Sequence, residues 1–417
     1  MDGRRVVVTG MGIISPMGND IATFKDNLLS GKSGIGPITK FDASELEVRI
    51  AGEVRNFDPA EHMNPNIIKY TDPITQFGMA AAKQAIHDAG LDFSQFDPYR
   101  LGISQGVGYG GWLSTLRLHK NFLENGVKSV DPFSILAVIP DAPSVQISLE
   151  YGLKGKVNTN NAACSSSAQA MEYAFDAIKS GRADIIVVLG TEAPLHPLSI
   201  AHFQGMRGAI TKRFNDSPEE ASRPFDSYRS GFVGSEGAAA LIFEGDDIAK
   251  ARKARIYAEM LGYGSTSDSY HIVYPTGEGA KQAMIAALKS AGIQNANGMY
   301  INSHGTSTKI GDRKESMAIA EVFDGYSVYV SSVKSMLGHM IGASAAAETV
   351  ASIIAMHGGF IPPTINLTNP HLEGDNACAP LNYVPNEPAQ QRFEIFLKNS
   401  FGFGGHNDCV LFQRWGE

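Results

Sequence analysis

Near its middle the chain reads Asn160-Asn161-Ala162-Ala163-Cys164-Ser165-Ser166-Ser167-Ala168, which places a cysteine among small residues. An apolar pattern with helical spacing follows at once, carried by Ala168, Met171, Phe175 and Ile178. A helix is therefore predicted to start at the cysteine, where unpaired N–H groups and the positive end of the helix dipole favour a thiolate. We interpret Cys164 as a candidate nucleophile with room for a substrate beside it.

Outward from this stretch, strand and helix patterns alternate, which predicts an α/β protein. A second series of elements begins near Arg255 and repeats the order of the first. Its expected members are strands over 256–260, 299–303 and 328–330, helices over 280–290, 312–323 and 339–356, and a closing hairpin of 395–399 with 410–412. We expect two fused α/β halves, residues 1–253 with the cysteine and residues 254–417 with two histidines.

The composition excludes several classes of protein. The 417 residues carry 35 Lys and Arg against 43 Asp and Glu, and a net charge of -8 disfavours general nucleic-acid binding. The chain has three cysteines, Cys164, Cys378 and Cys409, too few and too far apart for a disulfide framework, so we expect a cytoplasmic protein. No signal peptide and no apolar run of about 18 residues is present, so no membrane insertion is expected.

Three further stretches could supply chemistry. His304 follows an expected strand and opens His304-Gly305-Thr306-Ser307-Thr308, while His339 is expected at a helix start, five residues after Lys334. The glycine-rich turn Asn399-Ser400-Phe401-Gly402-Phe403-Gly404-Gly405 can point N–H groups into a pocket. Each such feature is commonly only structural, but three reactive side chains at the ends of regular elements favour one shared site.

The sequence gives less support to nucleotide binding and to zinc binding. Gly10-Met11-Gly12 follows a strand but lacks the third glycine of a dinucleotide loop, and no phosphate-binding Lys-Ser or Lys-Thr follows Gly106 to Gly111. Cys164, His304 and His339 could bind zinc only if they converge, and no closely spaced pair of ligands supports this. We therefore expect no metal and no cofactor.

At these four stretches the chain resembles the β-ketoacyl-[acyl carrier protein] synthases, closest to the synthase I/II branch, from Val6 to Phe412. The resemblance implies the thiolase fold, two similar α/β halves in five α-β-α-β-α layers, usually in a dimer. It implies an acyltransferase of fatty-acid, polyketide or polyene synthesis. Such an enzyme performs a decarboxylative condensation of malonyl carrier protein with a cysteine-bound acyl chain.

The resemblance also implies roles for individual residues. Cys164 is the nucleophile, its own N–H and that of Phe401 form the oxyanion hole, and His304 and His339 donate to the malonyl thioester oxygen. Neutral imidazoles suffice for this donation. Lys334 orders the site through its charge, and the supporting residues are Glu315, expected to pair with Lys334, and Asp312, expected to hold the adjacent loop.

The acyl pocket and the docking surface are implied less closely. Phe232 and Phe401 match aromatic positions that gate the pocket. Tyr109 stands where the family has a modest aliphatic residue, and we expect it to shorten or reshape the pocket together with Trp112. The alternative is that Tyr109 and Trp112 pack in a dimer interface. An acidic carrier protein needs a local basic patch, for which the candidates are Lys69, Arg207, Lys212 and Arg213.

Two competing functions stay open. A coenzyme A-dependent thiolase would need a second catalytic cysteine near the C-terminus, where Cys409 lies on an expected strand. A non-catalytic subunit that controls chain length would lack the nucleophile that Cys164 provides. The expected partners are an acyl carrier protein and either a second copy or a homologous subunit.

Overall fold

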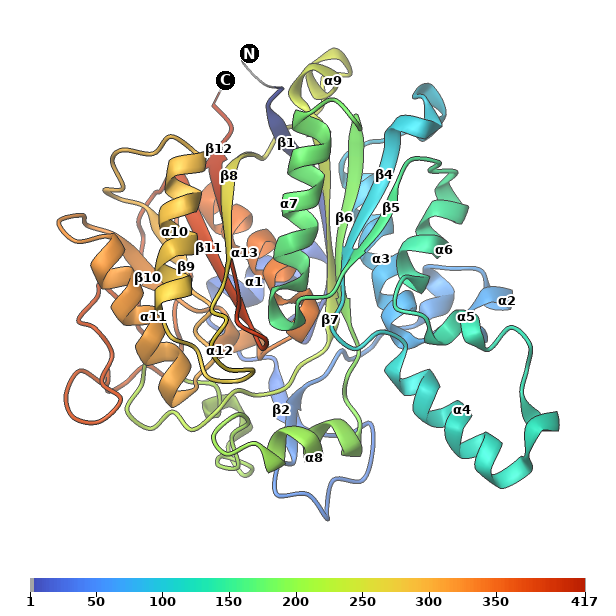
Figure 1. Ribbon diagram of the computed structural model, residues 1–417, viewed down its shortest axis with the longest axis horizontal. Helices are drawn as coiled ribbons and strands as arrows, with labels where there is room; N and C mark the ends of the chain where they lie inside the picture. The colour runs from blue at the N-terminus through green and yellow to red at the C-terminus, as the bar shows by residue number, and fades with distance from the viewer. Residues whose placement is uncertain (1–3, 417) are drawn as a thin grey trace.

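The computed structural model describes residues 4–416, and a ten-stranded sheet runs through its centre (Figure 1). The strand order is β10-β9-β11-β12-β8-β1-β7-β6-β4-β5, and a separate pair β2-β3 lies outside it. The strands are β1 (Val6–Ile14), β2 (Ile35–Pro37), β3 (Ile50–Gly52), β4 (Leu101–Gly106), β5 (Val157–Asn160), β6 (Ile185–Glu192), β7 (Gly237–Gly245), β8 (Ala258–Ser267), β9 (Tyr300–Asn302), β10 (Tyr329–Ser331), β11 (Ile395–Gly402) and β12 (His406–Arg414).

The two sides of the large sheet have the same topology. From the edge inward, one side runs β5-β4-β6-β7-β1 and the other β10-β9-β11-β12-β8, so each places its third, second, fourth, fifth and first strands in that order. In each side the outer three strands are parallel and the inner two antiparallel. The predicted α/β class is confirmed. The boundary between residues 253 and 254 falls between the last helix of the first half and β8, and it stays a prediction.

Helices make three further layers. Two central helices, α7 and α13, contact strands of both halves, so they lie between them (Figure 1). Helices α3 and α6 cover the outside of one half, and α10 and α11 that of the other. Their bounds are α3 (Pro73–Asp88), α6 (Ala142–Tyr151), α7 (Ser166–Lys179), α10 (Glu278–Ser290), α11 (Lys309–Val322) and α13 (Ser344–Gly358). The order of layers is α-β-α-β-α.

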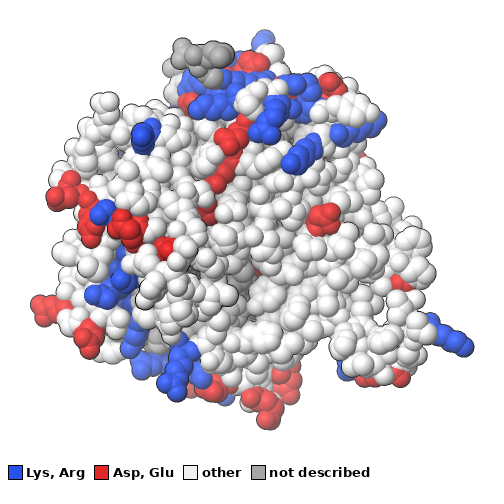
Figure 2. Space-filling model, viewed as in Figure 1, with Lys and Arg blue, Asp and Glu red and all other residues white. Residues whose placement is uncertain are grey.

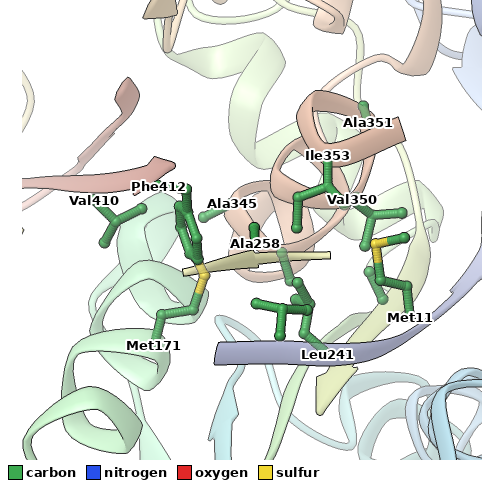
Figure 3. Close-up of a cluster of buried hydrophobic side chains, with 14 of the residues drawn as sticks. Met11, Met171, Leu241, Ala258, Ala345, Val350, Ala351, Ile353, Val410 and Phe412 are labelled. Carbon is green, nitrogen blue, oxygen red and sulfur yellow. The ribbon is translucent and has the colours of Figure 1, made fainter. Parts of the chain in front are cut away.

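The central layer explains the alanine-rich composition of α13. Its residues are buried from Ser344 to Met356, since both faces of the helix contact protein. Figure 3 shows Val350 and Ile353 of this helix packed with Met171 of α7, Leu241 of β7 and Phe412 of β12. Burying each large side chain of this kind stabilises the fold by roughly 1.5–3 kcal/mol, which fixes the two halves against each other.

The remaining helices lie at the periphery. They are α1 (Ile21–Leu29), α2 (Pro65–Ile68), α4 (Trp112–Asn125), α5 (Ile135–Val138), α8 (Pro197–Gly205), α9 (Asp246–Ala251) and α12 (Lys334–Leu337). The short 3-10 helices are η1 (Pro59–Glu61), η2 (Phe93–Gln95), η3 (Pro98–Arg100), η4 (Val127–Ser129), η5 (Ala163–Ser165), η6 (Pro218–Glu220) and η7 (Ile341–Ala343). Between residues 4 and 416, none of the helices is long and apolar enough to cross a membrane.

One expected helix begins later than the sequence pattern indicated. The prediction of a helix from His339 to Met356 was wrong at its start, because α13 begins at Ser344 and His339 lies in the connection before η7. Gly338 and Ile341 have φ angles of 71° and 45°, which a right-handed helix cannot contain. The histidine is therefore placed by a strained loop and not by a helix terminus.

Candidate active site

One cavity of about 1150 Å³ brings the four sequence stretches together. Cys164, His304 and His339 all line it, as do both aromatic gate candidates, Phe232 and Phe401. These residues come from both halves of the fold, since Cys164 and Phe232 precede β8 and the other three follow it. The predicted convergence of a thiol and two imidazoles in one cavity is thus present.

Cys164, the candidate nucleophile, lies in a strained turn. Cys164 is in η5, directly before α7, and the preceding Ala163 has a φ of 50°, in the left-handed region. Ser166 holds this turn, because its Oγ accepts from the N–H of Ala162 at 3.0 Å and donates to the carbonyl of Ala163 at 2.6 Å. A Cβ at Gly402 would lie 2.5 Å from the carbonyl oxygen of Ala162, so the glycine lets β11 approach the cysteine.

Burial and nearby charges act in opposite directions on the Cys164 thiol. Burial raises the pKa of the Cys164 thiol to about 12, although the charge of Lys334 and the N–H groups of Phe403 and Cys164 lower it. The turn removes the sulfur from water, which acts against the thiolate that the helix start favours. The thiolate stays a prediction.

A backbone N–H that the sequence analysis did not select also lies beside the thiol. The N–H that faces the Cys164 thiol, besides its own, belongs to Phe403, two residues after Phe401. Phe401 lies at the end of β11 with its ring 5.7 Å from that of His304. Its backbone role in an oxyanion hole stays a prediction.

The two imidazoles face each other across the cavity. Their ring centroids are 5.4 Å apart and the planes meet at 84°. Burial lowers the pKa of both His304 and His339 well below the usual value, and the charge of Lys334 lowers both further. Nδ1 of His339 lies 2.9 Å from the hydroxyl of Ser344. Both rings are therefore neutral at pH 7 and can donate one N–H each.

Lys334 has a different partner from the one expected. Its Nζ lies 2.5 Å from Oε1 of Glu348 on α13, so the predicted pairing with Glu315 was wrong. Glu315 instead accepts the backbone N–H groups of His304 and Gly305, both at 2.7 Å. Glu315 is on the helix that follows the His304 loop in sequence, so its carboxylate reaches back to that loop.

Asp312 secures a segment from the other half of the chain. Its Oδ2 accepts the N–H of Phe225 at 2.9 Å and lies 3.6 Å from Nε of the buried Arg229. Burial raises the pKa of Asp312 to about 6, against the charge of Arg229. The sequence predicted that Asp312 holds the neighbouring loop, and these contacts tie α11 to residues 225–229.

Aromatic rings line the pocket beyond the cysteine. Tyr109 lies against the cavity, with its ring 6.5 Å from Phe203, and Phe203 packs on Phe232 at 5.0 Å. Trp112 lies behind Tyr109, at 5.7 Å between ring centroids, and its Nε1 donates to Ser199 Oγ at 2.7 Å. Tyr109 thus borders the cavity, whereas Trp112 does not line it and contacts Tyr109 from behind.

A buried carboxylate that the sequence prediction missed holds the Tyr109 loop. Glu192, at the end of β6, accepts the N–H groups of Gly108 at 2.7 Å, Tyr109 at 3.0 Å and Gly342 at 3.0 Å. Burial raises its pKa to about 7. An acidic residue at the end of an otherwise apolar strand was the available signal.

The four basic residues predicted to dock the carrier protein lie in different surroundings. Arg207 lines the cavity, Lys212 pairs with Glu47 at 2.7 Å, and Lys69 lies over the ring of Tyr70. Arg213 is exposed nearby in sequence. Two basic residues that the sequence analysis did not select, Lys309 and Lys314 of α11, also line the cavity.

A second basic cluster lies far from the cysteine. Figure 2 shows Lys and Arg gathered around α9, where both termini lie in Figure 1. Arg4 contacts Asp184 and Asp247 there, beyond the carboxyl end of α7, whereas Cys164 precedes its amino end. This cluster is too remote to border the cavity. Across residues 4–416, no group of three or more His, Cys, Asp or Glu side chains could hold a metal ion.

Cys409 does not behave as a second catalytic thiol. It is fully buried in β12, it is not among the residues that line the cavity, and burial raises its pKa well above the usual value. Its Sγ lies 3.2 Å from Oδ1 of Asn399. The structure thus offers no support for the thiolase alternative.

Comparisons with known proteins identify the family. Residues 3–248 match the family model "Beta-ketoacyl synthase, N-terminal domain" and residues 257–368 match "Beta-ketoacyl synthase, C-terminal domain". The chain belongs to the β-ketoacyl synthase family. It is 41% identical over 418 residues to the 3-oxoacyl-[acyl-carrier-protein] synthase 2 of Coxiella burnetii and 39% identical over 416 residues to that of Staphylococcus aureus, with 99% of each chain covered.

Solved structures of ketosynthases are similar to this chain over nearly its whole length. The ishigamide ketosynthase/chain length factor matches with a TM-score of 0.90 at 33% identity, over 99% of this chain and 100% of that one. A β-ketoacyl synthase from Burkholderia phymatum matches with a TM-score of 0.91 at 32% identity and the same coverage. A third match is a type II polyketide acyl carrier protein in complex with its ketosynthase bound to the hexaketide, with a TM-score of 0.89 at 30% identity over all of both chains.

The family confirms the predicted thiolase fold and the predicted reaction class. This β-ketoacyl synthase is an acyltransferase that condenses carrier-bound acyl chains in fatty-acid or polyketide synthesis.

Proposed function

We propose that Cys164 carries the growing acyl chain and that His304 and His339 stabilise the malonyl enolate that lengthens it by two carbons. The observation that supports this most directly is the pair of neutral imidazoles, 5.4 Å apart, in the cavity that also holds the thiol. A protonated imidazole would bind a carboxylate, whereas a neutral N–H is matched to a developing enolate oxygen.

In the first stage, the Cys164 sulfur attacks the thioester carbon of an acyl carrier protein. The carbon–sulfur bond to the carrier breaks, and the thiol proton of Cys164 leaves with the carrier as its free thiol. Because burial raises the pKa of that thiol to about 12, sulfur attack and proton loss must be closely coupled. The nearby N–H groups of Cys164 and Phe403 can stabilise the negative charge that develops.

In the second stage, malonyl carrier protein loses carbon dioxide, and the electron pair of the broken carbon–carbon bond forms an enolate. His304 and His339 donate to its oxygen, and its carbon attacks the acyl carbon on Cys164. The bond to sulfur breaks, the thiolate takes one proton from solvent, and a β-ketoacyl carrier protein leaves. The overall reaction consumes one proton and releases one carbon dioxide.

The partner of this enzyme is proposed to be an acidic acyl carrier protein that docks at the cavity mouth. Arg207, Lys309 and Lys314 line the cavity and can contact an acidic surface or the carrier's phosphate. The solved relative with a bound acyl carrier protein supports this partner class. A cytoplasmic location is proposed with it, supported by the three unpaired buried cysteines.

A dimer is also proposed, with the α4–α5 segment in its interface. This segment projects from the body in Figure 1 and exposes a series of large apolar side chains: Phe122, Leu123, Val127, Val130, Phe133, Ile135 and Leu136. Such a patch is typical of an interface between subunits. The partner is a second copy or a homologous subunit, and a ketosynthase/chain length factor among the relatives supports the second form.

Intact-mass measurement after incubation with acyl carrier protein tests the function. The wild-type chain should gain one acyl group, Cys164→Ala should gain none, and Cys164→Ala should still release carbon dioxide from malonyl carrier protein. His304→Ala should show the reverse pattern, with acylation retained and carbon dioxide release lost. Acylation of Cys164→Ala, or undiminished carbon dioxide release by His304→Ala, would contradict the assignment.

A further inference from the structure

A second lysine lies beside the site and has no role in the chemistry described above. Lys398 is in β11, between its neighbours β9 and β12, and its side chain is fully buried. Its Nζ lies 2.6 Å from Oε2 of Glu348 and donates to the carbonyl of Asn399. Lysine is almost never fully buried in a central strand unless its charge is paired, so its presence calls for an explanation.

The explanation lies in the carboxylate that Lys398 shares. Glu348 forms an ion pair with each lysine: Oε1 lies 2.5 Å from Nζ of Lys334, and Oε2 lies 2.6 Å from Nζ of Lys398. All three side chains are at most 1% exposed. With Lys334 alone, the buried pair would be neutral. With both lysines charged, the three groups carry one net positive charge.

This net charge acts on the imidazoles. Lys334 and Lys398 are the two cations whose charges lower the pKa of His339, and both also lower the pKa of His304. Because Lys334, Lys398 and Glu348 are buried from water, their charges act on the imidazoles with little screening. The same charge favours the enolate that forms between the imidazoles.

We propose that Lys398 is a positioning residue for the condensation: its ammonium neutralises Glu348, which leaves the charge of Lys334 free to act on His304 and His339. The inference rests on the proposed function, because it assigns Lys398 a part in stabilising the malonyl enolate. Lys398 itself does not line the cavity and touches no reacting atom.

The groups that face Lys398 set its protonation. Burial lowers its pKa to about 8, against the attraction of Glu348 on α13, while Lys334 on α12 lowers it and Glu315 on α11 raises it. Cys409, on the adjacent β12, also senses its charge. The carbon dioxide release step should therefore weaken as the pH rises through about 8, where Lys398 loses its proton and the three groups become neutral overall.

Rates of carbon dioxide release from malonyl carrier protein between pH 6 and 10 test this proposal. The wild type should show a fall centred near pH 8. Lys398→Met should lose about tenfold in kcat at pH 7, with KM changed less than about twofold, since the lysine acts on the transition state and not on docking. Lys398→Arg keeps its charge throughout this range and should keep its rate up to pH 10.

A double variant separates charge from packing. Lys398→Met with Glu348→Gln removes one positive and one negative charge, which restores the net charge of the wild type. It should recover to within about threefold of the wild-type rate, and its fall near pH 8 should be absent. Lys289→Met, on the exposed side of α10, is the matched control and should leave the rate and the pH profile unchanged.

The outcomes are distinguishable. A wild-type rate that is flat to pH 10, or a folded double variant no faster than Lys398→Met alone, would overturn the proposal. Thermal unfolding identifies a variant that fails to fold. If Lys398→Met does not fold, the pH profiles of Lys398→Arg and of the wild type still test the role of Lys398. If the wild type forms the acyl-enzyme but releases no carbon dioxide at any pH, the proposed function fails and not merely the role of Lys398.

Discussion

The carboxylate of Glu315 accepts the backbone N–H of His304 with an N···O distance of 2.7 Å. The second carboxylate oxygen accepts the N–H of Gly305, also at 2.7 Å, and the amide of Asn399 donates to the first at 3.1 Å. One buried carboxylate on α11 thus joins the loop after β9 to β11. The position of the His304 ring depends on this junction.

Glu315→Gln should disturb that junction, because the amide replaces one acceptor oxygen with a donor that faces an N–H. We expect the free energy of unfolding to fall by about 1–3 kcal/mol, the cost of an unsatisfied buried group. Carbon dioxide release should fall more than acylation of Cys164, since the His304 loop serves the second stage. Urea unfolding and separate assays of the two stages measure these effects.

Glu321→Gln provides the control on the same helix. Glu321 is on the exposed side of α11 and pairs with Lys281 at 2.7 Å. Its loss should change stability by no more than about 0.5 kcal/mol and leave both stages unchanged. Equal effects of the two substitutions would show that the Glu315 junction does not position His304.

Glu192 gives the fold a specific pH dependence. Its pKa is raised by burial to about 7, so the folded state holds this proton more tightly than the unfolded chain does. The resulting stabilisation is complete below the ordinary glutamate pKa and is lost as the pH rises toward 7. Glu192→Gln cannot titrate, so the stability of the wild type relative to this variant should fall by about 2–3 kcal/mol between pH 5 and pH 8.

Urea unfolding of both proteins at the two pH values checks this difference. The comparison with the isosteric variant removes the contributions of all other titrating groups, provided that these do not contact position 192. A stability difference that is the same at pH 5 and pH 8 would show that Glu192 is already charged in the folded state at pH 5.

Tyr109→Ala should enlarge the acyl pocket, because this ring borders the cavity and packs on Phe203. We expect the preference of kcat/KM for longer over shorter acyl chains to rise about tenfold or more. Mass measurement of the carrier-bound products gives the chain lengths. Trp112→Phe, behind the cavity, should shift this preference less, and an unchanged product profile for Tyr109→Ala rejects its pocket role.

Arg207→Glu should weaken carrier-protein binding, because it reverses a charge at the cavity. We expect the Kd to rise about tenfold at low salt and the effect to shrink as salt is added. Lys212→Glu should have a smaller effect, since Lys212 is already paired with Glu47. Lys179→Glu, at the far end of α7 from Cys164, is the control; if it weakens binding as much as Arg207→Glu, docking does not occur at the cavity mouth.

Part of the site could be predicted from the sequence because its local signals are strong. The small residues around Cys164 and the glycines after Asn399 are required by close backbone approach, as the 2.5 Å that would separate a Gly402 Cβ from Ala162 O shows. Apolar periodicity located α10 and the hairpin of β11 and β12, which the structure confirms. The late start of α13 was missed because the strained φ angles before it leave no mark in the hydrophobic pattern.

Charge partners were the part that could not be predicted. Lys334 is 19 residues from Glu315 and 14 from Glu348, and nothing in the spacing shows which carboxylate faces it. The packing of α13 between the halves brings Glu348 to Lys334, while α11 turns Glu315 toward the His304 backbone. Lys398 was overlooked because a lysine in an apolar strand suggests an edge or a solvent face, and β11 has neither.

The sequence by itself determined the residues with chemical potential, the alternation of strands and helices, and the family to which they belong, because these depend on side-chain identity and local backbone preference. Only the tertiary structure decided the burial of the thiol, the partner of each buried charge and the surroundings of Tyr109. These depend on exclusion of water and on contacts between separate segments of the chain, and burial is a property of the folded whole.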